Sequence, residues 1–313
     1  MSINRALPRN VSFYDAAHPE VALGGFVQNG SITEANFLEF LSIILVLKPG
    51  PLDVKARKSN HIVSRTQVSL QIGIYDVYSD CIYSLSPINL IAQLLIFFPA
   101  PIQVSNEPWI PRLISYPTSG RHNSFQNTIR NRDRKCVISG TIVPEIFIQA
   151  NNWTTFEAAH IIPPEQSSLS IQHEHPQSIK DNDSTESPQS TINSPTNGLL
   201  LRSDLQQMFY GYLISLNPDD GYKVVVFDID LYGYDGKVLD PICRNPADPD
   251  HVSDDFLRWH FRQAVLANVR GAGEPIFEHD FPPGSDMLNE IISGPYANER
   301  FQLEMAARFQ EVA

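Results

Sequence analysis

Three short stretches decide the fold of this chain: CVISG at residues 136–140, FEAAHIIP at residues 156–163 and NGLLLRSDLQ at residues 197–206. The apolar side chains of Lys135–Ile138 and Phe156–Ile162 predict two strands. Arg202–Phe209 carries its apolar residues at helical spacing and predicts the start of a helix. The order strand, strand, helix predicts an α+β core with a histidine near the end of the second strand.

These stretches resemble the core of the HNH endonucleases, in the ββα-metal or His-Me finger form found in many fungal proteins. The resemblance covers most of the chain and is strongest over 130–140, over 156–163 and from Asn193 onward. It places His160 where the family's first histidine activates water, and Asn197 where the family's asparagine holds the loop around that histidine. The structural alternative for His160 is a polar anchor at a strand end, and Asn197-Gly198 is also a favourable turn dipeptide.

The position of the family's second histidine carries Gln206, and this departure bears directly on metal binding. That histidine is normally a metal ligand, and a carboxamide is a poor replacement for imidazole on a transition metal. Ala159, directly before His160, has no ligand atom in its side chain. Tyr210 stands where relatives often carry Asp, one helical turn after Gln206. We therefore expect neither a bound metal nor another cofactor.

The chain is acidic, with a net charge of −12. An acidic protein repels polyanions unless its positive charges are clustered. One cluster precedes residue 136, and it consists of Arg121 and the four candidate phosphate contacts Arg130, Arg132, Arg134 and Lys135. The alternative is a solvated turn before a strand. Nucleic acid is thus a disfavoured partner, and a small molecule is the expected one.

The cysteines Cys81, Cys136 and Cys243 are few, odd in number and far apart, and they form no CxxC pair. A four-cysteine zinc site is excluded, and no disulfide framework is expected. Met1–Phe13 lacks the apolar segment of a signal peptide, and the most apolar run, Ile88–Phe98, is too short to span a bilayer. These features predict a reducing, cytoplasmic location without a membrane partner.

We expect three regions: a β-rich N-terminal region at 1–118, the HNH-like core at 119–245 and a helical extension packed on the core at 246–313. Further strands are predicted at Asn10–Tyr14, Val21–Phe26, Val68–Tyr75 and Tyr222–Phe227, a helix or buried strand at Asn36–Leu47, and helices after Ser253 and at Asn298–Phe309. In the helix after Ser253, the sequence leaves open whether His260 and Arg262 face the site or the solvent. We interpret His260 as a helix-surface or packing residue rather than a catalyst.

Within the core, residues 163–196 are mostly Ser, Gln, Pro, Asp, Asn and Glu, with few aliphatic side chains. Such a segment buries too little surface to offset its ordering entropy, so we expect a mobile loop. His173 and His175 lie in it. Ordering the loop to bring either histidine to the metal position would cost about 1–2 kcal/mol per residue in backbone entropy. Their plainer interpretation is two polar residues in a polar loop.

Three function classes follow from these features. The first is a degenerate HNH protein that acts without metal on a small molecule, as a cyclase, isomerase or pericyclase of fungal secondary metabolism. Its site would comprise the catalytic residues His160, Asn197 and Gln206 and the substrate-binding residues Tyr210 and Asp204. The second is an endonuclease with a rewired metal site, and the third is a non-catalytic module that binds nucleic acid or protein. The missing second histidine favours the first class.

Overall fold

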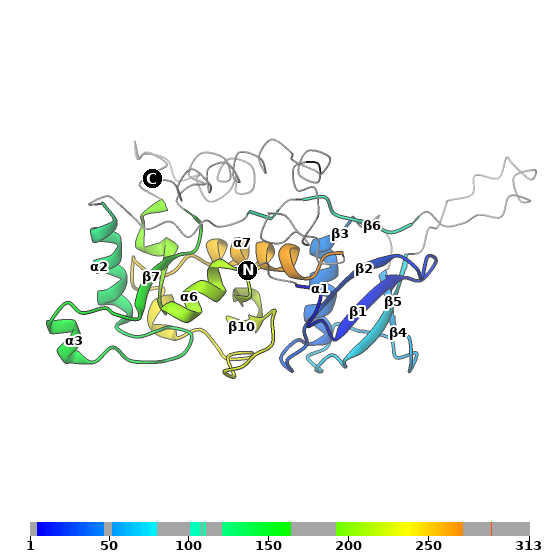
Figure 1. Ribbon diagram of the computed structural model, residues 1–313, viewed down its shortest axis with the longest axis horizontal. Coiled ribbons are helices and arrows are strands. Elements are labelled where there is room, and N and C mark those ends of the chain that lie inside the picture. Colours follow the sequence, from blue (N-terminus) through cyan, green and yellow to red (C-terminus); the bar gives the residue numbers. More distant parts are fainter. Residues whose placement is uncertain are drawn as a thin grey trace, which may run out of the picture. The chain divides into compact units, whose positions relative to one another are not determined.

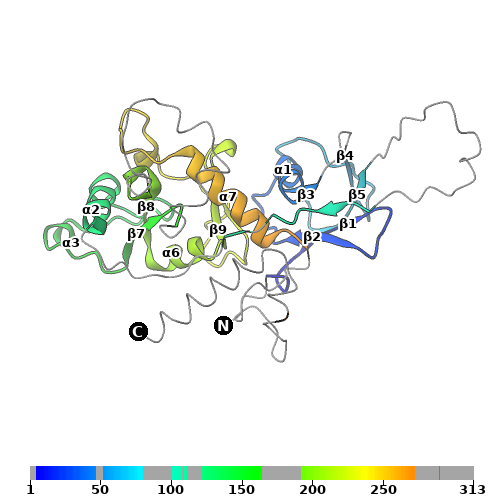
Figure 2. The same cartoon turned by 90° about the horizontal axis from the view of Figure 1, so that it is seen from above.

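The computed structural model describes residues 5–46, 52–79, 101–107, 109–110, 121–163, 192–271 and 289 (Figure 1; Figure 2). The chain divides into two compact units. Unit 1 comprises Met1–Trp109, Phe227–Ile229 and Val265–Ala313, and unit 2 comprises Ile110–Val226 and Asp230–Ala264. The expected regions 1–118, 119–245 and 246–313 stay predictions. Both helices and strands are present, which confirms the α+β class.

Unit 1 is built on a four-stranded mixed sheet with the strand order β2-β1-β5-β4. Strand β1 pairs antiparallel with β2 and parallel with β5, and β5 pairs antiparallel with β4. The elements of this unit are β1 (Val11–Asp15), β2 (Ala22–Phe26), α1 (Glu34–Ile44), β3 (Leu45–Val46), β4 (Leu52–Ala56), β5 (Gly73–Ser79) and β6 (Gln103–Val104). Strands β3 and β6 form a separate antiparallel pair.

Helix α1 resolves the choice between helix and buried strand that the sequence leaves open at Asn36–Leu47. Thr33 caps the helix in a capping box, because its side chain accepts the Asn36 amide while the Asn36 side chain accepts the Thr33 amide. Phe37 packs against Phe13 and Tyr75 of the sheet at ring-centroid distances of 5.4 and 5.3 Å. The cap and the aromatic face together fix this segment as a helix.

The strand predicted at Val68–Tyr75 is wrong in its first half, since β5 begins only at Gly73. Val68 and Ile72 are exposed, while Leu70 is buried. The Leu70 amide donates to the Ile32 carbonyl, and the Gln28 carboxamide donates to the Leu70 carbonyl. The alternation of apolar and polar residues therefore reflects one anchored loop residue, and not the pairing of a strand.

A buried carboxylate in the first turn of α1 makes the stability of unit 1 depend on pH. Glu34 accepts hydrogen bonds from His61 at 2.5 Å, from the Ser64 amide and from the Thr66 hydroxyl. Burial raises the pKa of Glu34, but these hydrogen bonds and the His61 charge together hold it below its usual value. A carboxyl whose pKa is lowered by folding stabilises the fold above its unfolded pKa, and this contribution is lost as the pH falls.

We expect Glu34→Gln to lower the free energy of unfolding by about 1–2 kcal/mol at neutral pH, because charge-assisted hydrogen bonds are lost. The deficit should shrink below pH ~4.3, the usual pKa of an unfolded glutamate, as the wild-type carboxyl takes up its proton. Urea unfolding at several pH values measures it, with Glu20→Gln as the control at an exposed carboxyl. A deficit that stays constant down to acid pH would contradict this assignment.

Unit 2 contains the two antiparallel strand pairs β7–β8 and β9–β10. Its elements are α2 (Arg121–Asp133), α3 (Glu145–Gln149), β7 (Phe156–His160), η3 (Pro195–Asn197), β8 (Gly198–Arg202), α6 (Ser203–Tyr210), β9 (Ile214–Asn217), η4 (Pro218–Asp220), β10 (Lys223–Val226), η5 (Pro241–Arg244) and α7 (Asp254–Asn268), the last continuing into unit 1. The side chains of α2, β7, β8 and α6 share one buried core. The chain passes from β8 directly into α6, which completes a β-β-α unit.

The first strand of the β-β-α unit lies elsewhere than the sequence suggests. Lys135–Ile138 is not a strand: Lys135 forms only an isolated bridge with Ile142, and a turn follows. Gly140 closes this turn with a φ of 76°, a backbone conformation that favours glycine. The two strands are instead β7 and β8. Val137 is buried beside them, and its amide donates to the Leu200 carbonyl.

Several expectations concern residues outside those that the structure describes: Cys81, Ile88–Phe98, most of the loop 163–196 with His173 and His175, and Asn298–Phe309. The two described cysteines, Cys136 and Cys243, are buried free thiols. Among the described residues, no helix is long and apolar enough to cross a membrane.

Candidate functional site

His160 is the last residue of β7 and is almost fully buried. Its imidazole stacks on the Phe125 ring of α2 at a centroid distance of 3.9 Å and an interplanar angle of 6°. It pairs across the strands with Gly198, where a Cβ atom would overlap Phe125 and Ile129. Glycine at this position therefore lets α2 approach closely enough to hold the imidazole plane.

Asn197 is 0% exposed and ties together the two chain segments beside His160. Its side-chain oxygen accepts the Ile162 amide at 2.8 Å. Its side-chain nitrogen donates to the carbonyls of Ile162 and Ile192, at 3.0 and 2.9 Å. Its own carbonyl accepts the Ile161 amide. The structure thus places Asn197 where it fixes the backbone that follows His160.

A second asparagine contacts the imidazole itself. His160 Nε2 lies 3.3 Å from Asn193 Oδ1. A carbonyl oxygen only accepts, so Nε2 carries the hydrogen in this contact. The sequence predictions missed both Asn193 and Phe125. The helical spacing of Phe125 and Ile129 is a signal for α2, but no sequence pattern identifies the contact of Asn193.

Helix α6 presents Gln206 and Tyr210 one turn apart. The Tyr210 hydroxyl accepts the His160 backbone amide at 3.2 Å, so this tyrosine lies directly beside the strand end that carries the histidine. Gln206 is partly exposed on the same helix. The structure therefore brings His160, Asn197 and Tyr210 together around one loop, with Gln206 on the adjacent turn of α6.

These residues do not fit a divalent-metal site. Ala159 is buried and has no ligand atom, Gln206 offers a neutral amide, and the Tyr210 oxygen already accepts a backbone amide. No group of three His, Cys, Asp or Glu side chains that could hold a metal occurs in the described part of the chain. The partners described for the imidazole are the Phe125 ring and the Asn193 side-chain oxygen.

Asp204 forms an ion pair that does not involve His160, Asn197 or Tyr210. Its carboxylate pairs with the Arg202 guanidinium through two contacts of 3.1 Å at the first turn of α6. Both side chains are partly exposed. The structure places no contact between Asp204 and His160, Asn197 or Tyr210 among the interactions it describes, so the expected substrate-binding role of Asp204 stays a prediction.

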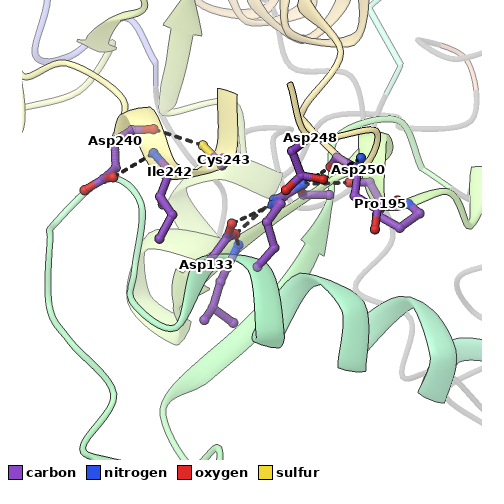
Figure 3. A network of polar contacts seen from close by, with 10 residues as sticks. Asp133, Pro195, Asp240, Ile242, Cys243, Asp248 and Asp250 are labelled. Atoms are coloured by element: carbon purple, nitrogen blue, oxygen red, sulfur yellow. Dashed lines mark hydrogen bonds and ion pairs between the residues drawn. The ribbon is translucent and has the colours of Figure 1, made fainter. Parts of the chain in front are cut away.

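Arg132 is not available as a phosphate contact, which corrects the expectation from the sequence. Its side chain is 3% exposed and pairs with the fully buried Asp133 at 2.6 Å. Its other nitrogens donate to the carbonyls of Pro195, Gly198 and Asp250. Asp133 in turn accepts the Leu200 amide at 2.8 Å, and Figure 3 shows the network around this carboxylate. The two charges neutralise each other, and this allows both side chains to be buried.

The other three candidate phosphate contacts, Arg130, Arg134 and Lys135, each contact a different residue. Arg134 pairs with Glu145 at 2.8 Å, and Lys135 pairs with Asp240 at 2.6 Å. Arg130 lies over the Trp153 ring at 5.0 Å, and burial lowers its pKa. A run of basic residues in the sequence is therefore distributed over different contacts. Of Arg121, the structure describes only the backbone.

His260, on α7, is a packing residue. It is fully buried and stacks on Phe209 at 3.7 Å. Its Nε2 donates to the Phe209 carbonyl, and its Nδ1 accepts the Ser215 hydroxyl, at 3.0 and 2.7 Å. Both ring nitrogens are bonded inside the core, as expected for a packing residue.

We expect Tyr210→Phe to lower the free energy of unfolding by about 1 kcal/mol, the net value of one hydrogen bond, because the His160 amide loses its acceptor. Chemical denaturation measures the change. Tyr232→Phe is the matched control, since its ring is exposed. Equal effects of the two substitutions would show that the Tyr210 hydroxyl does not hold the strand end.

Comparison with known families gives two separate matches. Residues 136–217 match a family described as HNH endonuclease. Residues 8–83 match a family described as a domain of unknown function, DUF8573. No curated protein and no solved structure matches the chain significantly. The HNH match contains His160, Asn197, Gln206 and Tyr210, so the site described above is an HNH-like site.

Proposed function

We propose that the HNH-like site of this chain works without the divalent metal of that family and catalyses proton transfer within a small molecule. The product is an isomer or a ring-closed form of the substrate. The observation that supports this proposal is the Tyr210 hydroxyl, which accepts the His160 backbone amide. Gln206, at the position that the resemblance assigns to the second histidine, offers only a neutral amide. The site keeps an oriented imidazole in surroundings that suit hydrogen bonding better than metal ligation.

His160 supplies the acid-base chemistry. In its neutral form, the imidazole takes a proton from a C–H or O–H group of the substrate. The electron pair left behind shifts within the substrate, and the resulting imidazolium returns the proton to another of its atoms. Because the proton returns to the same molecule, the reaction needs no co-reactant. The stack on Phe125 and the Asn197 contacts keep the ring in one orientation through both transfers.

The carboxamide of Gln206 provides hydrogen bonding on the adjacent turn of α6. An amide N–H can donate to oxygen that gains negative charge when the proton leaves. A site with one acid-base group and a few donors matches cyclisation and isomerisation, the reactions expected from the sequence. We propose fungal natural-product pathways as the metabolic setting, by analogy with other folds recruited for such steps.

The probe for this proposal is nitrobenzisoxazole, whose ring opens when a base removes one C–H proton. In EDTA, we expect a protein-dependent rate that falls by about 100-fold in His160→Ala, within the range of general-base catalysis. His18→Ala is the control for loss of an imidazole elsewhere, since His18 lies in unit 1. A rate in EDTA that does not depend on His160 would overturn the proposal.

Endonuclease action is the second candidate, and the family match to residues 136–217 favours it. It requires phosphate contacts and a ligand set that the described residues do not bring together. Arg132 is buried, and Arg134 and Lys135 are paired with carboxylates. This candidate predicts metal-dependent nicking of DNA with a steep dependence on salt.

A further inference from the structure

A small apolar cluster adjoins the His160 loop. Its buried members are distinct from those of the main core of unit 2, and Phe256 packs against both. Its buried members are Ile162, Ile192 and Trp259, and the partly buried Ile110 and Phe256 pack against it. Ile162 follows β7 by two residues, and Trp259 belongs to α7. Because Ile110 and Phe256 are only partly buried, they form the side of the cluster that reaches solvent.

The cluster and the candidate catalytic histidine are held by the same residues. The Asn197 side chain donates to the carbonyls of Ile162 and Ile192, and so positions two of the three buried members. Asn193, next to Ile192, contacts His160 Nε2. A molecule seated against this cluster would therefore lie beside the backbone that orients the imidazole.

Trp259 contributes a hydrogen-bond donor to this cluster that the fold does not use. Trp259 is 3% exposed, and its indole Nε1 is buried without a hydrogen-bond partner in the part of the chain that the structure describes. The indole N–H of Trp153, in contrast, donates to Asn151 at 3.0 Å. Buried donors are nearly always paired in native proteins, so an unpaired one among aliphatic side chains points to an acceptor that arrives from outside.

We infer that the Trp259 indole N–H binds the carbonyl or ether oxygen of an apolar ring compound that packs on Ile162 and Ile192. The inference rests on the proposed function, and it defines the substrate class as a mainly hydrocarbon molecule with an acceptor oxygen. Ligand pockets commonly combine apolar walls with a few placed polar groups, and here the wall is isoleucine and the polar group is one donor. The described members of the cluster carry no charge, so this contact favours a neutral ligand.

The test uses the full chain with ¹⁵N-labelled tryptophan, which gives indole resonances for Trp109, Trp153 and Trp259. Cyclohexanone is the probe, and methylenecyclohexane is its matched control of similar shape without an oxygen. We expect cyclohexanone to move the Trp259 indole proton downfield in a saturable way and to leave Trp109 and Trp153 in place. Methylenecyclohexane should cause no such downfield shift. Equal responses to both compounds, or no response at Trp259, would overturn the inference.

Trp259→Phe assigns the resonance and keeps an aromatic ring in the cluster. We expect this variant to bind cyclohexanone about fivefold more weakly, the equivalent of one net hydrogen bond. Unchanged affinity in a variant with wild-type thermal unfolding would also overturn the inference. His160→Ala should leave the Trp259 response intact. A wild type that shows the Trp259 response but no His160-dependent turnover of nitrobenzisoxazole would therefore refute the proposed chemistry alone. His160-dependent turnover without a Trp259 response would refute the Trp259 contact alone.

Discussion

Replacing Asn197 with alanine is expected to lower the free energy of unfolding by about 3–5 kcal/mol, because three buried hydrogen bonds are lost and their backbone partners stay buried. Those partners are the Ile162 amide and the carbonyls of Ile162 and Ile192. The Asn193 side chain, in comparison, has one described hydrogen bond. The substitution should also remove His160-dependent proton transfer, because the backbone after His160 loses its support.

Denaturant unfolding measures the effect, and Asn193→Ala provides a matched control. The hydrogen bond described for the Asn193 side chain joins it to the imidazole, and this side chain is partly buried. We expect Asn193→Ala to cost less than about 1 kcal/mol. If the two alanine variants were equally stable, the clamp assigned to Asn197 would be wrong.

Breaking the Arg132–Asp133 pair is the second large effect. Arg132→Met should lower the free energy of unfolding by about 3–5 kcal/mol, since removing one partner leaves an uncompensated buried charge. Asp133 is 0% exposed in its side chain, and the guanidinium also satisfies three backbone carbonyls. Burial raises the pKa of Asp133, while Arg132 opposes that shift. Without Arg132, the carboxyl can relieve its charge only by taking up a proton.

The deficit of Arg132→Met should therefore shrink as the pH falls, because a buried carboxyl with a raised pKa destabilises the fold only while it is charged. Arg134→Met is the matched control: its partner Glu145 is exposed, and exposed pairs contribute about 0–1 kcal/mol. The double variant Arg132→Met with Asp133→Asn should be more stable than the sum of the single effects predicts. Strict additivity in this cycle would contradict a coupled buried pair.

The sequence predicted the parts of unit 2 in which local pattern and burial agree. Strand β7, helix α6 and strand β10 appear within one or two residues of their expected bounds. Strand β8 was missed because Leu199, Leu200 and Leu201 form a continuous apolar run, and periodicity cannot assign a run buried on both faces. The strand predicted at Lys135–Ile138 was wrong for the converse reason. Val137 and Ile138 are apolar, but they lie in a buried turn.

The candidate site was predictable in its identities but not in its contacts. The motif placed His160, Asn197, Gln206 and Tyr210 in one region, and the structure joins three of them through the loop after β7. Charge alone could not show that Arg132 is buried, because its neutralisation depends on carbonyls from residues distant in the sequence. Trp259 carries no local signal, since its role depends on Ile162 and Ile192 meeting α7.

A divalent metal is the feature that most separates the two candidate functions. Working HNH sites use the metal to stabilise charge on the phosphate, a task for which Gln206 and Tyr210 offer no anionic ligand. The proposed chemistry instead needs only the oriented imidazole of His160 and nearby donors. The presence or absence of metal-dependent DNA cleavage therefore bears on the central claim without any knowledge of the natural substrate.

The most direct measurement is nicking of a supercoiled plasmid with Mg²⁺, Mn²⁺, Ni²⁺ or Zn²⁺, run with wild type, His160→Ala, and the double variant Gln206→His with Tyr210→Asp. We predict no metal-dependent nicking by the folded wild type above the level of His160→Ala, and Mn²⁺ binding by calorimetry only in the double variant. Metal-dependent nicking by the wild type that His160→Ala abolishes would contradict the proposal and identify a nuclease with a replaced ligand.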